Sequence, residues 1–209
     1  MKAFWRWLTW VAVAGLALQL FFVGRIALMA VVDPQSTAFQ RSEAWRVTTE
    51  KGRLAWRQQW VPYGQIADTL KRAVIASEDG DFVNHDGVEW EAIEKAWARN
   101  ARAEAQAAQR TAQARPGKPA RPAKIVGGST ITQQLAKNLL LSGERTLLRK
   151  GQEFVLTLAL EMTLSKQRIL EIYLNSVEWG EGVFGAEAAA QHYFRKPAAR
   201  LSAWEAARL

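Results

Sequence analysis

The chain has 209 residues, 49% of them apolar and 23% charged, which is enough for one buried core but too few for a multidomain enzyme. Lys and Arg outnumber Asp and Glu by 28 to 20, and the resulting net charge of +8 favours an anionic partner such as a phosphate, an acidic lipid surface or nucleic acid. With no Cys and two His, the composition excludes a thiol nucleophile, a disulfide framework and a zinc-finger ligand set, so carboxylates, hydroxyls and cations remain for any chemistry.

The first apolar segment predicts one transmembrane helix over residues 8–32. Residues 8–23 carry no charge, and the apolar stretch continues across Arg25 alone, beyond the ~20 residues that span a bilayer. Tryptophans near its start and an arginine near its end are typical of the two membrane interfaces. Because Lys2 and Arg6 precede the helix, we expect the N-terminus (residues 1–7) to be cytoplasmic and the remainder of the chain to cross.

A cleaved signal peptide is the alternative interpretation of this segment. The apolar stretch is longer than the roughly 7 to 15 residues of a signal-peptide core, and its one A-x-A string, Ala12–Ala14, lies inside it. We therefore favour a retained anchor. It should end at Asp33-Pro34, because the residue before a proline disfavours helical geometry.

A polar connector, residues 33–60, leads to a part of the chain in which apolar residues recur at helical spacing. Period-two alternation is confined to short pieces such as residues 56–61. The soluble part should therefore be mainly α-helical, with at most a small strand element. We expect helices over residues 64–78, 88–108, 130–141, 147–164, 166–174 and 186–193, and a further one from residue 202.

A basic segment separates two of these expected helices. Residues 99–124 contain seven basic residues and one glutamate, and much of this segment consists of Ala, Arg, Gln and Pro without a usable apolar face. We interpret residues 103–124 as a flexible basic insertion. A solvated loop and a specific anion-binding patch both remain open for it.

The first cluster that could carry chemistry lies where the helix over residues 64–78 should end. Glu78 and Asp79 are followed by a short run of acidic, aromatic and glycine residues that contains His85. A carboxylate at a helix C-terminus faces the negative end of the macrodipole, which disfavours the anion and suits a general base. A solvated acidic turn with a structural histidine is the alternative.

The second cluster is GGSTITQQLAKN, residues 127–138. Its glycines allow close backbone approach, and Thr130 with Gln133 forms a capping-box pattern that opens a helix whose first N–H groups favour an anion. Thr130, Gln134 and Lys137 stand at i, i+4 and i+7, so a hydroxyl, an amide and an ammonium share one face. A capped helix with a solvated face explains the cap but not this polar stripe.

The third cluster comprises Arg145, Arg149, Lys150 and Glu153, three cations and one carboxylate within about two helical turns. An ordinary i, i+4 pair between Arg149 and Glu153 is the simplest interpretation. Together with Lys137, the set could instead neutralise a diphosphate, which would indicate an enzyme acting on an anionic leaving group.

The strings EDGDFVNHDG, GGSTITQQLAKN, RKGQE and KQRILEIYLN, followed by EGVFGAEAAAQHYF and LSAWEAARL, resemble in order the blocks of the peptidoglycan glycosyltransferases of family 51. The resemblance covers residues 61–209, which we expect to form the glycosyltransferase domain. It implies a mainly α, lysozyme-like domain with a small membrane-proximal lobe. It also implies polymerisation of lipid II into β-1,4-linked glycan with release of undecaprenyl diphosphate.

The same resemblance assigns roles to individual residues. Glu78 would be the general base, and Glu153 would orient the site or assist departure of the diphosphate. No metal ligand set is expected and no cofactor is required, although the resemblance leaves room for a divalent cation such as Mg²⁺ at the diphosphate. The residues expected to bind substrate are Asp79, His85, Ser129, Thr130, Gln134, Lys137, Arg145, Arg149 and Lys150.

Location and partners follow from the resemblance and the predicted anchor. We expect a single-pass protein of the bacterial inner membrane with a periplasmic catalytic domain. Its partners would be lipid II, the lipid-linked growing glycan chain and the cytoplasmic membrane, with cell-division or elongation proteins as candidates and no nucleic acid. Transpeptidation is not expected, because S-x-x-K and K-T-G motifs are both missing.

Two departures from the family and two alternative functions stay open. The basic insertion is longer than usual, and relatives generally continue beyond the position of Leu209, so we expect either a truncated domain or a core closed differently. A lysozyme-like lytic hydrolase would use Glu78 as a general acid. A non-enzymatic, membrane-anchored scaffold would bind anionic lipid or nucleic acid through its basic segment.

Overall fold

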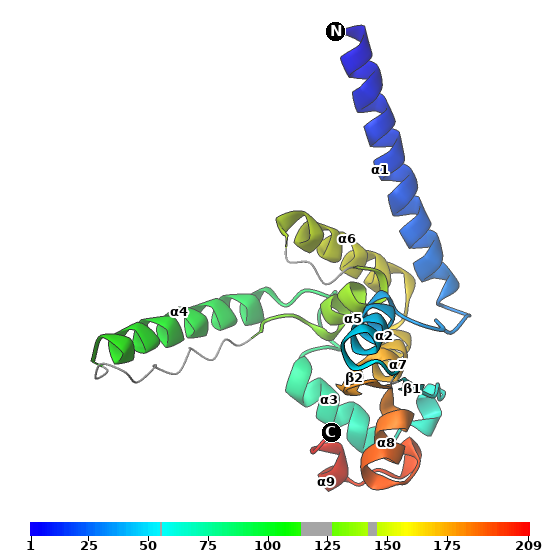
Figure 1. Cartoon of the computed structure of the whole chain (residues 1–209), viewed down its shortest axis with the longest axis vertical. Helices are drawn as coiled ribbons and strands as arrows, with labels where there is room; N and C mark the ends of the chain where they lie inside the picture. The colour runs from blue at the N-terminus through cyan, green and yellow to red at the C-terminus, as the bar shows by residue number, and fades with distance from the viewer. Residues whose placement is uncertain (55, 114–126, 142–145) are drawn as a thin grey trace.

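The fold is mainly α-helical, which confirms the predicted class (Figure 1). The computed structural model describes residues 1–209 except 55, 114–126 and 142–145. Three short strands form one sheet, in which β3 lies between β1 and β2, parallel to β1 and antiparallel to β2. The described elements are α1 (Lys2–Leu28), α2 (Ala38–Lys51), β1 (Arg57–Gln58), η1 (Tyr63–Gln65), α3 (Asp68–Glu78), α4 (Trp90–Gln113), α5 (Ile131–Leu140), α6 (Leu147–Thr163), α7 (Lys166–Ser176), β2 (Glu178–Gly180), β3 (Val183–Phe184), α8 (Ala186–Phe194), η2 (Ala198–Arg200) and α9 (Ala203–Ala206).

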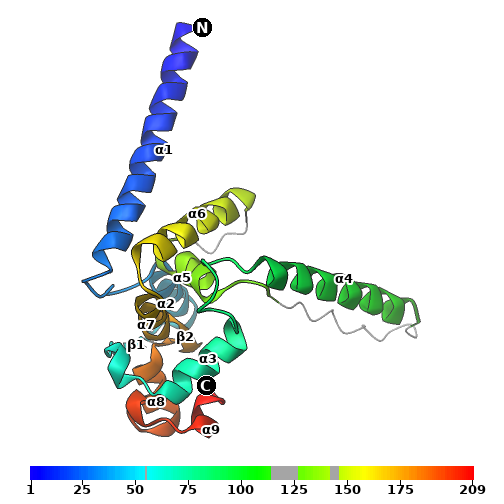
Figure 2. The same cartoon turned by 180° about the vertical axis from the view of Figure 1, so that it is seen from behind.

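The first helix, α1, forms a long arm that projects from the rest of the fold (Figures 1 and 2). Within the described part of the chain, one helix is long and apolar enough to cross a membrane, and that helix is α1. It overlaps the span predicted over residues 8–32 but begins at Lys2 and ends at Leu28. It ends early because the N–H groups of Met29, Ala30 and Val31 bond to carbonyls three residues earlier. These bonds tighten the last turn before Asp33-Pro34 is reached.

The segment expected to be a connector contains a helix that packs into the fold. Thr37 and Gln40 form a capping box that opens α2, and the Gln40 side chain donates a 3.0 Å hydrogen bond to the backbone oxygen of Ser176. Val47 is fully buried, and α2 lies against α5. The sequence did not reveal α2 because few of its residues are apolar and its anchoring partner is far away in the chain.

The core is built around α5, which packs against α2, α6 and α7. Ile131, Leu135 and Leu139 follow one another at i, i+4 and i+8 and are at most 1% exposed. One face of α5 is therefore wholly inside the fold. The predicted capping box between Thr130 and Gln133 is present and starts this helix, which fixes where its polar face begins.

The helix α4 corrects the predicted basic insertion. Residues 103–113 belong to α4, which extends away from the body as a second arm, so the expectation of a loop was wrong there (Figures 1 and 2). The physical reason is that Ala, Arg, Gln and Glu are strong helix formers even without an apolar face. Residues 114–124 of the predicted insertion lie outside the described residues.

The buried side chain of Asn175 connects α7 to the segment that follows β1. Its Oδ1 accepts the Val61 N–H at 3.0 Å, and its Nδ2 donates to the backbone oxygens of Val61 and Glu171 at 3.0 and 2.9 Å. Asn175 is 0% exposed, so water cannot take over these hydrogen bonds. This amide therefore holds two segments together at the end of α7.

We predict that Asn175→Ala lowers the free energy of unfolding by about 3 kcal/mol, because it leaves buried backbone groups of Val61 without partners. Denaturant unfolding in detergent micelles would measure the loss. The matched control is Gln167→Ala, which removes an exposed amide from the same helix and should change stability by less than about 0.5 kcal/mol. Equal stabilities of the two variants would contradict this account.

Candidate active site

Glu78 is the last residue of α3, and its carboxylate is exposed at the helix end. Its Oε2 accepts a 2.9 Å hydrogen bond from Nε2 of Gln134 on α5, and Oε1 of Gln134 accepts one of 3.1 Å from the Tyr173 hydroxyl on α7. Three helices therefore meet at the Gln134 amide. Burial, together with the negative charges of Glu78 and Asp79, raises the pKa of Tyr173, which keeps its phenol a hydrogen-bond donor.

The next residue, Asp79, has its side chain fully buried and joins the end of α3 to the start of α5. Its Oδ2 accepts the Ile131 N–H at 2.9 Å, which is the first N–H of α5, and its Oδ1 lies 2.8 Å from Nε2 of His85. Nδ1 of His85 accepts the Gly87 N–H at 3.0 Å, so the ring proton is assigned to Nε2, which donates to Asp79. Asp79 and His85, which follow Glu78 in this turn, are thus held in place by hydrogen bonds.

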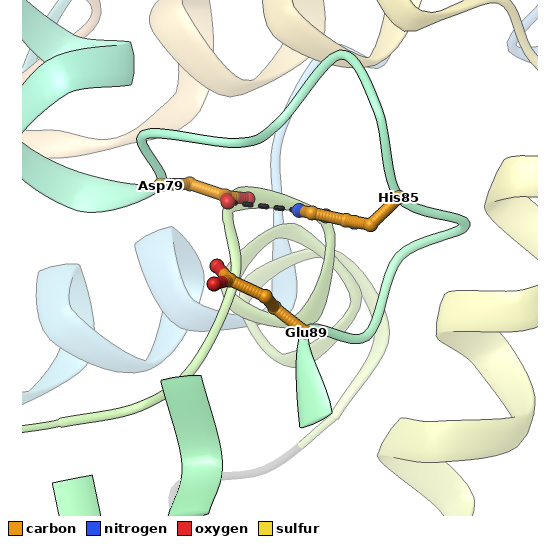
Figure 3. Close-up of side chains that lie close together, drawn as sticks. All are labelled: Asp79, His85 and Glu89. Atoms are coloured by element: carbon orange, nitrogen blue, oxygen red, sulfur yellow. Dashed lines mark hydrogen bonds and ion pairs between the residues drawn. The ribbon is translucent and has the colours of Figure 1, made fainter. Parts of the chain in front are cut away.

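Asp79, His85 and Glu89 bring their ligand atoms within 4.8 Å of one another, a spacing that could hold a metal ion (Figure 3). The donor set does not fit that role well. Both oxygens of Asp79 and both ring nitrogens of His85 already take part in hydrogen bonds. A cation would have to break the contacts that fix the start of α5, so we interpret the cluster as a structural clamp.

Thr130 belongs to the same clamp. It is 3% exposed, its Oγ1 donates to the Gly87 oxygen at 2.6 Å, and the same atom accepts the Gln133 N–H at 3.1 Å. Thr130, Asp79 and His85 were expected to bind substrate, but their observed contacts are internal. The sequence placed Asp79 and His85 in one cluster and Thr130 in another, and the structure joins the two clusters at the start of α5. Substrate binding by these three residues stays a prediction.

A cavity of about 690 Å³ lies beside α5 and α6; we call it the basic cavity. Arg149 and Lys150 both form ion pairs with Glu153, whose side chain is 4% exposed, the first at 3.0 Å. The predicted third cluster is therefore assembled, except that Arg145 lies outside the described residues. The cavity is lined by Phe39, Ser42, Ser129, Gln133, Gln134, Lys137, Asn138, Leu141, Thr146, Leu147, Arg149, Lys150 and Glu153.

A second cavity of about 670 Å³ is lined by Glu78 and Tyr173, the two residues that bond to Gln134; we call it the Glu78 cavity. Glu78, Tyr173, Glu178 and Trp179 contribute polar groups to its lining, and burial raises the pKa of Glu178. Gln134 lines the basic cavity and bonds to Glu78 and Tyr173 of the second one. The Gln134 amide thus connects Glu78 to the cavity that the cations line.

The sequence reasoning missed Tyr173, Glu178 and Trp179. One signal was available for Tyr173, which stands among apolar residues in the helix predicted over residues 166–174. A buried phenol generally requires a hydrogen-bond partner, so this residue could have been singled out, although its partner Gln134 could not. Glu178 and Trp179 follow the helix in a short strand that no periodicity indicated.

Comparison with known proteins gives a consistent result. A family model described as Transglycosylase matches residues 46–209. The chain is 53% identical over 208 residues to a protein named biosynthetic peptidoglycan transglycosylase from Burkholderia pseudomallei (strain K96243), covering 98% of this chain and 74% of that protein. It is 52% identical, with the same coverage, to the protein of that name from Burkholderia thailandensis, and 51% identical over 196 residues to the one from Burkholderia orbicola (strain MC0-3).

We predict that Asp79→Ala lowers the free energy of unfolding by about 2 to 4 kcal/mol, because the first N–H of α5 and the His85 ring lose a buried acceptor. Denaturant unfolding in detergent would measure it. The matched control is Glu89→Ala, which removes the second carboxylate of the cluster and should leave stability within about 0.5 kcal/mol.

The same control variant tests the clamp interpretation against a metal site. Addition of Mg²⁺ or Mn²⁺ should shift the melting temperatures of the parent chain and of Glu89→Ala equally. A stabilisation by either cation that disappears in Glu89→Ala would show that the three residues bind a metal together.

Proposed function

The chain belongs to the transglycosylase family, and from this premise we propose that it polymerises lipid II into β-1,4-linked glycan strands, releases undecaprenyl diphosphate and does not crosslink the strands. The observation that supports the assignment in this chain is the hydrogen bond between Glu78 and Gln134. It places an exposed carboxylate beside a cavity lined by cations. A base next to an anion-binding site is the pair of groups that this reaction requires.

We assign the base to Glu78. Its carboxylate would take the proton from the 4-hydroxyl of the acceptor GlcNAc while that oxygen attacks C1 of the MurNAc at the reducing end of the growing chain. The C1–O bond to the diphosphate breaks on the opposite face, which inverts C1 and gives the β linkage. The acceptor sugar then lies in the Glu78 cavity, because its hydroxyl must reach this carboxylate.

The donor diphosphate is assigned to the basic cavity. Lys137, Arg149 and Lys150 line it and can neutralise the charge that develops on the leaving group. A diphosphate departs without strong acid assistance, so cations can replace the second carboxylic acid that glycosidases use. Ser129 and Gln134 line the same cavity and supply neutral hydrogen-bonding groups.

Glu153 orients the cations in this proposal. Its carboxylate is almost entirely buried and bonded to both Arg149 and Lys150. The two ion pairs hold the guanidinium and the ammonium on one side of α6, facing the cavity. Direct protonation of the leaving group by Glu153 is disfavoured, because both its oxygens are already engaged.

A divalent cation at the diphosphate fits this cavity poorly. Hard divalent cations take several oxygen ligands, whereas the described lining offers one carboxylate, Glu153, which already pairs with two basic side chains. We therefore propose that the protein's own cations do the work of charge neutralisation. Recruitment by cell-division or elongation proteins stays a prediction.

The location follows from α1. We propose that α1 spans the cytoplasmic membrane with residues 1–7 in the cytoplasm, and that the catalytic domain lies in the periplasm. Lys2 and Arg6 at the start of the helix support this orientation. An anchored enzyme and its lipid-linked substrates diffuse in the same two-dimensional surface, which raises their effective concentration.

We predict that Glu78→Gln reduces the polymerisation of labelled lipid II by the purified 209-residue chain at least 10²-fold, the range expected for loss of a general base, while circular dichroism stays unchanged. The matched control is Glu178→Gln, which neutralises another carboxylate of the same cavity and should retain turnover within about threefold. Loss of activity in Glu178→Gln but not in Glu78→Gln would move the base to Glu178.

Incubation of the same protein with finished peptidoglycan separates synthesis from hydrolysis. A lytic enzyme would release fragments from the polymer and make no polymer from lipid II. The proposed polymerase should do the reverse.

We predict that Lys137→Ala raises the apparent KM for lipid II about tenfold, because the ammonium that faces the diphosphate is removed from the basic cavity. The matched control, Lys95→Ala, removes an exposed lysine from α4 and should leave KM unchanged. An unaltered rate and KM for Lys137→Ala would remove this residue from the site.

A further inference from the structure

The arm α1 consists of a free half and a packed half. Side chains before Gln19 are almost all exposed, whereas Gln19, Phe22, Ile26 and Met29 stand at i, i+3, i+7 and i+10 and face the body of the fold. Ile26 and Met29 are 0% and 5% exposed within the main core. The second half of the predicted anchor is therefore part of the folded domain.

The free and packed halves meet at a pair of glutamines. Nε2 of Gln19 donates to Oε1 of Gln152 at 2.8 Å, and Nε2 of Gln152 donates back to Oε1 of Gln19 at 3.0 Å. Gln152 belongs to α6, which lies beside α1 (Figure 1). An amide in an apolar helix is unfavourable in a bilayer unless it finds a polar partner, and here each amide satisfies the other.

The pair attaches α6 to a defined level of the anchor. Gln19 precedes the end of α1 at Leu28 by nine residues, roughly 14 Å along the helix axis, so the contact is well separated from the covalent connection. On α6, Gln152 directly precedes Glu153 and follows Arg149 and Lys150 by one turn or less. A shift of α6 along α1 would therefore shift the whole ion-pair group.

We propose that Gln19 is a positioning residue. Its paired side-chain hydrogen bonds with Gln152 set the depth of Arg149, Lys150 and Glu153 relative to the membrane. The proposal rests on the function assigned above, in which these cations receive the diphosphate of a lipid. Such a diphosphate lies at a depth fixed by its hydrocarbon chain. The cations meet it without displacing the lipid only if α6 is held at a matching level.

Leu147 and Leu148 support an approach of α6 to the membrane. They form the first turn of α6 and are 93% and 86% exposed, which is unusual for two adjacent leucines. A bilayer surface would cover them at the end of α6 that also carries Arg149 and Lys150. The amide pair would then fix both the level and the orientation of this end.

A kinetic comparison tests the proposal, with the 209-residue chain carrying Gln19→Leu or Gln152→Leu. In vesicles containing lipid II, each variant should raise the apparent KM roughly fivefold to tenfold and leave kcat within about twofold. In detergent with a short-chain lipid II analogue, whose depth is not fixed, both constants should stay within about twofold of the parent. The matched control, Gln167→Leu, replaces an exposed glutamine of α7 and should behave as the parent in both media.

Unchanged KM in vesicles would overturn the proposal. Equal losses in vesicles and in detergent would also overturn it, because they would indicate that the pair only stabilises the fold.

Crosslinking gives a readout that does not depend on activity. The chain has no cysteine, so Gln19→Cys/Gln152→Cys can be treated in membranes with a short bifunctional thiol reagent. We expect efficient crosslinking of this pair and none for Thr9→Cys/Gln152→Cys, in which the first cysteine lies in the free half of α1. Equal or absent crosslinking of the two pairs would overturn the arrangement, whereas inactivity of the parent chain with lipid II would overturn the proposed function alone.

Discussion

The carboxylate of Asp79 is the contact on which the arrangement of this site depends. It accepts the first N–H of α5 through one oxygen and the His85 ring through the other, with no exposed surface of its own. Because Asp79 directly follows Glu78, this buried contact determines where the end of α3 stands relative to Gln134 on α5. A charge placed at the start of α5 also complements the macrodipole of that helix. The two adjacent acids thus differ in role: Asp79 fixes the start of α5 relative to α3, and Glu78 faces solvent.

From that fixed point, the polar groups of the site separate into two regions with opposite charge requirements. In the proposed reaction, the Glu78 cavity needs a free carboxylate, whereas the basic cavity needs cations that no carboxylate has fully neutralised. Gln134 stands between them and bonds to Glu78 and Tyr173 through a neutral amide. A neutral bridge links the proposed base to the basic cavity without an ion pair that would neutralise both kinds of group. Glu153 pairs with two of the three cations in the described lining of the basic cavity, and Lys137 has no carboxylate partner among the described residues.

Much of this could be predicted from the sequence where the signal is local. The starts of α5, α6 and α7 lie within one residue of prediction, since their apolar residues recur at helical spacing and Thr130, Thr146 and Ser165 cap them. The Arg149–Glu153 pair follows from the same periodicity. The failures concern distant contacts. The helix α2 is anchored by Gln40 on Ser176, and Tyr173 acts on Gln134, 39 residues earlier. The Thr130 hydroxyl likewise donates to the Gly87 oxygen, 43 residues earlier, a contact that the sequence does not reveal. Substrate binding by Thr130, which the resemblance implies, stays a prediction.

The membrane arm extends this logic from the site to the whole molecule. A tether alone would need only a span and a flexible linker, but Ile26 and Met29 lie in the core and Arg168 bonds to both the Met29 oxygen and Asp33. These contacts hold the segment after α1 against the domain, where a flexible linker would otherwise act as a hinge. The end of the anchor is therefore packed into the domain, and in our proposal the position of the cations follows the position of α1 in the bilayer. In the proposed reaction the donor and the acceptor both carry long lipids, so confinement to the membrane already limits their search to two dimensions. A packed anchor would in addition fix the depth at which the cations meet the diphosphate.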